Sequence, residues 1–189
     1  MNKNKSEFQQ YHDWLVTRSW SGLLYRRLYL YPKVWSGIKG RVLDVGCGIG
    51  DFVRLTKNAV GVDINPFNIE FCKKRGIDAH LFTNTMPFND ESFDTVLFDN
   101  VIEQIYDPSK VLKEALRVLK KNGTLIIGVP GLEHFFYDQD HKVFYAENFL
   151  KNRFMRQELN YKSIFYTPKN KYLRKFFVHS CRWVVYEKK

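Results

Sequence analysis

Long apolar stretches are missing from this sequence. No run approaches the roughly 18 apolar residues that a membrane-spanning helix needs. The polar start, Met1-Asn2-Lys3-Asn4-Lys5, is not followed by the apolar segment of a secretory signal. We therefore expect a protein that has no membrane span and is located in the cytoplasm.

Cysteine is also scarce, with three residues, Cys47, Cys72 and Cys181. Their odd number argues against a disulfide framework and their spacing gives no metal motif, which fits a reducing compartment. Internal repeats, low-complexity tracts and long linkers are absent as well. A length of 189 residues with 44% hydrophobic residues therefore predicts a single domain with a well-formed core.

The net charge of +10 is unevenly distributed along the chain. Residues 1–41 hold eight basic and two acidic residues, residues 42–141 hold ten and fifteen, and residues 142–189 hold twelve and three. Basic ends of this kind are typical either of a solubilising surface or of a protein that meets an anionic substrate, such as a phosphorylated sugar. RNA is the least favoured anion, because no RNA-binding module accompanies the charge, and no DNA partner is expected.

Strand and helix patterns alternate from Arg41 onward. The expected strands are 41–45, 59–63, 78–82, 93–98 and 124–129, and the expected helices are 51–57, 66–75 and 108–120. Such alternation predicts an α/β fold, in which a parallel sheet carries helices on both faces.

The two ends of the chain have patterns of their own. Aromatic and leucine residues recur at helical spacing over 6–36 and predict two short helices. Beyond residue 130 we expect a loop over 131–144, a helix over 146–158 and strands at 161–166 and 182–187. Residues 170–180 fit either a basic amphipathic helix or the start of a strand.

The most informative segment runs from Val42 to Phe52. An apolar strand is followed by glycines at alternate positions, Gly46, Gly48 and Gly50, and a helix can begin at Asp51. Glycine tolerates backbone angles that side chains forbid and lets a ligand approach the main chain. This segment therefore predicts a ligand-binding loop at the carboxyl end of a parallel sheet.

The spacing G-x-G-x-G differs from the G-x-G-x-x-G of dinucleotide-binding loops. Asp44, two residues before the first glycine, would repel a pyrophosphate but suits a ligand with an amino group and a positive sulfur. The run Asp44-Val45-Gly46-Cys47-Gly48-Ile49-Gly50 resembles the first motif of the class I S-adenosylmethionine-dependent methyltransferases. Phe93-Asp94, followed by Val101-Ile102-Glu103, resembles the fourth-strand region of the small-molecule members.

This resemblance covers residues 41 to about 130. It implies a Rossmann-like sheet of seven strands, mostly parallel, with one of the last two strands antiparallel. It also implies three parts within the single domain, a helical lid at 1–40, a cofactor-binding core at 41–130, and a substrate loop with the last strands at 131–189.

The resemblance further implies S-adenosylmethionine as the cofactor and S-adenosylhomocysteine as the product. Asp44 would contact the methionine amino group, and the alternative is an acid that merely caps the turn. Gly46, Cys47 and Gly48 would lie against the amino-acid end of the cofactor. Asp63, at the end of the second strand, would accept hydrogen bonds from both ribose hydroxyls.

The remaining cofactor residues include departures from the family pattern. Ile64 would form an apolar wall for the adenine, while Asp99 and Asn100 would face the sulfonium. Relatives often carry an acid before a Leu-Pro-Phe run to hold the adenine amino group, but here Asn84 or Thr83 would have to accept that hydrogen bond.

A hydroxyl acceptor also needs a general base. The loop after the fifth strand offers the candidates His134, Tyr137, Asp138, Asp140 and His141. We select His141, because Asp140-His141-Lys142 resembles a stretch in which relatives carry a His, although a structural His is the alternative. No metal site is expected.

We therefore expect an enzyme that moves a methyl group to an O or N atom of a small metabolite, for example an anionic sugar or glycan precursor. Gln104, where relatives often carry His, and the missing adenine acid leave open an inactive cofactor-binding regulator. An RNA methyltransferase is the remaining alternative.

Overall fold

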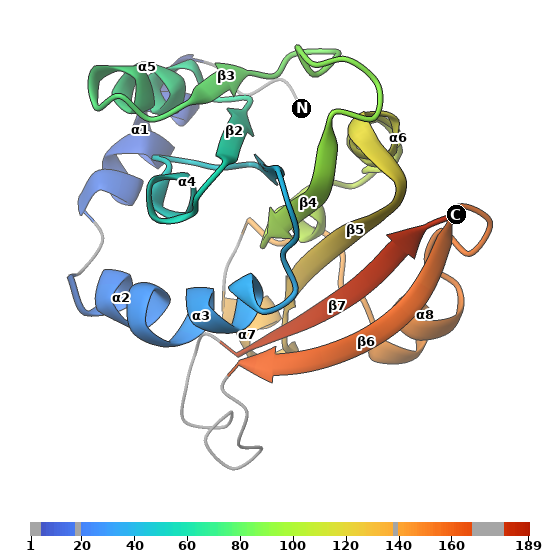
Figure 1. The fold of residues 1–189 in the computed structure, drawn as a ribbon. Coiled ribbons are helices and arrows are strands. Elements are labelled where there is room, and N and C mark those ends of the chain that lie inside the picture. Colours follow the sequence, from blue (N-terminus) through green and yellow to red (C-terminus); the bar gives the residue numbers. More distant parts are fainter. Residues whose placement is uncertain (1–4, 18–19, 138–139, 168–179) are drawn as a thin grey trace.

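The computed structural model describes residues 5–17, 20–137, 140–167 and 180–189. It contains one seven-stranded sheet in the order β3-β2-β1-β4-β5-β7-β6, with helices on both faces (Figure 1). The strands are β1 (Val42–Val45), β2 (Ala59–Asp63), β3 (Ala79–Leu81), β4 (Phe93–Asp99), β5 (Leu119–Pro130), β6 (Leu159–Thr167) and β7 (Cys181–Lys188). Strands β1 to β5 pair in parallel, and β7 lies antiparallel between β5 and β6. The predicted α/β fold is confirmed.

The amino-terminal helices are α1 (Lys5–Thr17), α2 (Trp20–Tyr25), a π-helical turn η1 (Arg26–Leu30) and α3 (Tyr31–Trp35). The segments α2, η1 and α3 follow one another without a break, so the two predicted helical stretches are present. Pro32 occupies the first turn of α3, directly after the π-helical turn.

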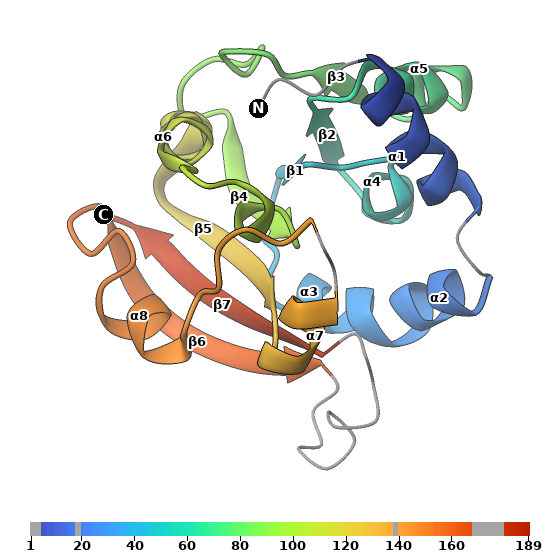
Figure 2. The same ribbon diagram turned by 180° about the vertical axis from the view of Figure 1, so that it is seen from behind.

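The remaining helices are α4 (Asp51–Leu55), α5 (Pro66–Lys74), η2 (Ile102–Gln104), α6 (Ser109–Val118), α7 (Leu132–Tyr137) and α8 (Glu147–Asn152). Apolar side chains alternate between the two faces of β1, as expected for a strand buried on both sides. Leu43 joins the core beneath α6 and α8, while Val42 joins Val34 of α3 and Phe52 of α4 on the other face (Figure 2).

The structure differs from the sequence prediction in the second half of the chain. The predicted loop at 131–144 contains α7, and the predicted helix at 146–158 ends at Asn152. Strand β5 begins at Leu119 rather than at Thr124, although the Asn122-Gly123 pair does interrupt its pairing with β4. Residues 170–179 lie outside the described residues.

Within the described ranges, no helix is both long enough and apolar enough to cross a membrane.

Candidate functional site

Three acidic residues meet at the carboxyl edge of the sheet. Asp44 lies in β1, and Asp63 and Asp99 end the strands on either side of it. In the parallel register Val45 is opposite both Val62 and Phe98, so Asp63 and Asp99 each extend one residue beyond it. The exposed fraction is 3% for Asp44, 7% for Asp63 and 12% for the Asp99 side chain. This is the edge at which open α/β sheets bind ligands.

The glycine loop after β1 is attached to β2. The backbone N–H groups of Gly46 and Cys47 donate to the carbonyl of Val62 at 2.8 and 3.0 Å, and that of Gly48 donates to Asp63 Oδ2 at 2.8 Å. At Gly46 the backbone has φ of +76°, and a Cβ atom there would lie 2.6 Å from Val101 Cγ2. A side chain at Gly46 would therefore strain the loop and displace the turn after β4.

Asp63 is held by backbone donors from both sides. Its Oδ1 accepts from the N–H of Asn65 at 2.7 Å, while Oδ2 accepts from Gly48. Burial raises the pKa of Asp63, and these two hydrogen bonds act in the opposite direction. Each carboxylate oxygen has a second lone pair, so both can still accept from a ligand. The next residue, Ile64, is 39% exposed and presents apolar surface beside this carboxylate.

Asp99 is paired with a residue that the sequence analysis missed. Nη1 of Arg26, in η1, donates to Asp99 Oδ2 at 2.6 Å, and the exposed fraction of the Arg26 side chain is 28%. Asn100 donates through Nδ2 to Asp99 Oδ1 at 2.8 Å. No local pattern identifies Arg26, because its partner lies 73 positions away in the sequence.

The electrostatics of this edge are dominated by the carboxylates. Burial first, and then the neighbouring Asp99 and Asp63, raise the pKa of Asp44 well above its usual range, while Arg26 opposes them. Three carboxylates thus face one guanidinium at this edge of the sheet. A buried surplus of negative charge is unfavourable by itself and is relieved by a ligand that brings positive charge.

Helix α1 lies over the glycine loop. A Cβ atom at Gly48 would be 3.3 Å from Leu15 Cδ1, so the leucine closes directly on the loop backbone. Asn65 Nδ2 donates to the carbonyl of Phe8 at 2.8 Å, and His12 Nδ1 lies 2.9 Å from Asn68 Oδ1. These contacts hold the helix above the ends of β1 and β2.

His141, the predicted base, has a side chain that is only 2% exposed. Its Nδ1 lies 3.0 Å from the carbonyl oxygen of Phe135, and its Nε2 lies 3.8 Å from Oε1 of the fully buried Glu103. The Phe135 ring stacks on the imidazole at 5.4 Å between centroids. The ring is therefore fixed between α7 and η2.

The other predicted residues lie at differing depths. His134 is partly exposed, with Nδ1 3.8 Å from Cys181 Sγ and its ring 5.6 Å from that of His141. Asn84 is exposed on the loop after β3. Asp138 lies outside the described residues. Across the described part of the chain, no group of three or more His, Cys, Asp or Glu side chains is arranged to hold a metal ion.

Sequence comparison links the segment that carries this site to known proteins. Residues 43–127 match the family model of a methyltransferase domain. An uncharacterized protein of Methanocaldococcus jannaschii is 36% identical over 136 residues, which are 67% of this chain and 66% of that protein. A ubiquinone/menaquinone biosynthesis C-methyltransferase of Rickettsia massiliae is 33% identical over 132 residues, which are 60% of this chain and 53% of that enzyme. The chain thus spans less than two thirds of the length of these relatives.

Solved structures share the whole fold. The crystal structure of a Thermotoga maritima SAM-dependent methyltransferase, described as a possible histamine N-methyltransferase, aligns with a TM-score of 0.72. The alignment covers 98% of this chain and 96% of that one at 23% sequence identity. At this identity the likeness establishes the fold alone.

The raised pKa of Asp44 predicts an effect on stability. A carboxyl whose pKa is higher in the folded than in the unfolded chain destabilises the fold once pH exceeds its unfolded pKa, and the cost is complete above its folded pKa. Asp44→Asn should therefore increase the free energy of unfolding at pH 8, by about 1 kcal/mol or more. The gain should shrink as pH falls toward about 4.

Urea unfolding of the ligand-free protein at several pH values measures this difference. Asp78→Asn is a matched control, because the Asp78 side chain is 61% exposed. A variant that is less stable than the wild type at pH 8 would contradict the raised pKa of Asp44.

Proposed function

This chain belongs to the class I S-adenosylmethionine-dependent methyltransferases, and we propose that it transfers the cofactor's methyl group to an O or N atom of a small metabolite. The observation that carries the proposal is the set of buried carboxylates at the ends of β1, β2 and β4. S-adenosylmethionine supplies two positive centres, an amino group and a sulfonium, together with a ribose diol. These are the groups that an excess of buried carboxylate oxygens can bind.

The residues present fit this cofactor. Asp63 would accept from the ribose hydroxyls with the lone pairs that Gly48 and Asn65 leave free. Asp44 would face the amino group, and the exposed side chain of Ile64 would lie against the adenine. Gly46, Cys47 and Gly48 would line the amino-acid end through their backbone, while Asn84, replacing the usual acid, would accept from the adenine amino group.

Arg26, in the amino-terminal turn η1, would also take part in cofactor binding. In the ligand-free arrangement it neutralises Asp99 at 2.6 Å. We expect it to turn to the cofactor's carboxylate, which leaves Asp99 and Asn100 to face the sulfonium. With Leu15 of α1 above the glycine loop, residues 1–40 would then serve as the lid over the cofactor.

The cofactor supplies an electrophilic methyl group, and the chain would position the acceptor in line with it. His141 would hold the proton lost by a hydroxyl acceptor on Nε2, because Nδ1 lies against the carbonyl of Phe135 and the Glu103 carboxylate that Nε2 faces would stabilise the imidazolium. Glu103 would act as a positioning residue for the imidazole.

The acceptor would be a small and anionic molecule, such as a phosphorylated sugar or a glycan precursor. The support is the basic composition of residues 1–41 and 142–189, which flank the acidic core. We place the protein in the cytoplasm and propose no DNA partner. The quinone-biosynthesis relatives give a second acceptor class to be screened beside the sugars.

Cofactor binding is the first test of this function. In calorimetric titrations the wild type should bind S-adenosylmethionine and S-adenosylhomocysteine with micromolar affinity. Asp63→Ala should weaken both by about a hundredfold, because two charge-assisted hydrogen bonds are lost. Asp78→Ala, which removes an exposed acid, should bind like the wild type. No binding by folded, ligand-free wild type would refute the proposal.

The proposed contact of Arg26 with the cofactor's carboxylate is tested by comparing substitutions at Arg26 and at its sequence neighbour Arg27. Arg26→Gln should weaken the binding of both ligands by about tenfold, since each carries the same carboxylate. Arg27→Gln removes an equal charge from the exposed adjacent residue and should change the affinity little. Equal effects of the two substitutions would show that Arg26 acts only through general charge.

A further inference from the structure

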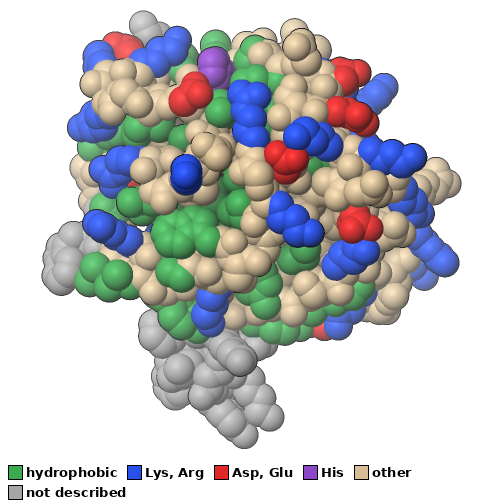
Figure 3. Space-filling model, viewed as in Figure 1, with side chains coloured by type: hydrophobic (Ala, Val, Ile, Leu, Met, Phe, Trp, Pro, Cys, Tyr) green, Lys and Arg blue, Asp and Glu red, His purple; other side chains and the backbone are tan. Residues whose placement is uncertain are grey.

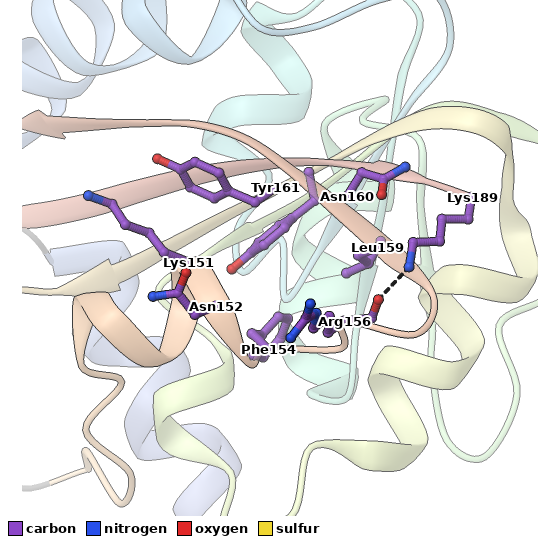
Figure 4. Close-up of a pocket in the computed structure, with 9 residues that line it drawn as sticks. Lys151, Asn152, Phe154, Arg156, Leu159, Asn160, Tyr161 and Lys189 are labelled. Carbon is purple, nitrogen blue, oxygen red and sulfur yellow. Dashed lines mark hydrogen bonds between the residues drawn. The ribbon is translucent and has the colours of Figure 1, made fainter.

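A pocket separate from the carboxylate site lies at the opposite end of the sheet. It has a volume of about 440 Å³ and lies between α8, the turn that follows it and the paired ends of β6 and β7 (Figure 4). Leu159, at the start of β6, pairs with Lys188, at the end of β7. Because β7 is antiparallel to β5, these ends lie away from the edge that holds Asp99.

The lining of this pocket is basic. Lys151, Arg156 and Lys189 contribute to it, and none of its nine lining residues is acidic. Lys151 is paired with Glu147 at 2.6 Å. Among the described residues neither Arg156 nor Lys189 forms an ion pair, and Lys189 Nζ donates to the carbonyl of Arg156 at 2.5 Å.

The surroundings add to this charge. Within the described part of 142–189 there are eight basic and three acidic residues. In the space-filling view, Lys and Arg side chains are spread over this face, including the side where β6 and β7 lie, with Asp and Glu side chains among them (Figure 3). The two lining side chains without an ion pair among the described residues, Arg156 and Lys189, can attract an anion, and an arginine fork matches a phosphate group in particular.

The rest of the lining indicates more than a bare phosphate. Tyr161 is 37% exposed, and its ring meets the buried Tyr186 edge-on at 6.4 Å, so part of the ring remains open. Asn160 brings an amide group that can donate and accept, while the Asn152 amide, whose Nδ2 donates to Asn148 Oδ1, can still accept through its oxygen. A volume of about 440 Å³ lies within the range of small-molecule sites, roughly 300 to 1,000 Å³.

The geometry points to a nucleotide-binding site in this pocket, with the phosphate against Arg156 and Lys189 and the base against Tyr161. Aromatic rings stack on bases of any sequence, and the amides can meet a base edge. The nucleotide can be a free mononucleotide or one unit of an RNA strand, since both present the same phosphate and base. Because the pocket is remote from the carboxylate site, its ligand is not the methyl acceptor in the course of transfer.

The test uses the full chain. Binding of S-adenosylhomocysteine is measured first, and the protein is then kept saturated with it so that the carboxylate site is filled. Uridine monophosphate is then titrated by calorimetry, with uridine and inorganic phosphate as partial ligands. We expect millimolar or tighter binding of the nucleotide and weaker binding of either part. Arg156→Ala should reduce the nucleotide affinity by about tenfold, and Tyr161→Leu should remove the preference for the nucleotide over phosphate.

Arg153→Ala is the matched control, because Arg153 is exposed nearby but does not line the pocket. It should leave the affinity nearly unchanged. Equal losses in the Arg153 and Arg156 variants would overturn the proposal in favour of diffuse charge, and so would the absence of nucleotide binding by the wild type.

An oligouridylate distinguishes the two sources. Tighter binding of the oligomer than of the mononucleotide, with steep salt dependence and the same loss in Arg156→Ala, supports an RNA unit. Equal affinities support a free nucleotide. Since S-adenosylhomocysteine binding is measured in the same samples, failure of this proposal is distinct from failure of the proposed function.

Discussion

The ligand-binding edge of this fold depends on carboxylates that are buried at the ends of three adjacent parallel strands. The register of β1 with β2 and β4 brings Asp44, Asp63 and Asp99 to one edge of the sheet, although they lie far apart in the sequence. Backbone donors from Gly48 and Asn65 and the guanidinium of Arg26 offset part of their charge. The part of the carboxylate charge that is not offset lowers the stability of the free protein, as is usual at functional sites. It also makes this edge selective for a cationic ligand.

The amino-terminal helices both pack on the sheet and reach the carboxylate site, and different side chains make the two sets of contacts. Leu30, Tyr31 and Val34 are buried in the core that α3 shares with the sheet, which is ordinary packing. Leu15 and Arg26 instead reach the glycine loop and the end of β4. Residues 1–40 can therefore support the sheet and also cover the carboxylate site, because their helices supply both sets of contacts.

The central strands and the acids that end them could be predicted from the sequence, because buried parallel strands form short apolar runs with few alternatives. Strand β2 has the bounds that the pattern predicts. Helix α7 could not be found, since its six residues are too few to establish a helical period. Arg26 and the burial of His141 depend on contacts between distant segments, about which local sequence carries no signal.

The central claim is that these carboxylates form the cofactor site, and a crystal structure of the full chain with S-adenosylhomocysteine tests it most directly. The account predicts both ribose hydroxyls within hydrogen-bond distance of Asp63 and the amino group facing Asp44. Ligand density elsewhere, or a ribose held without Asp63, would contradict it.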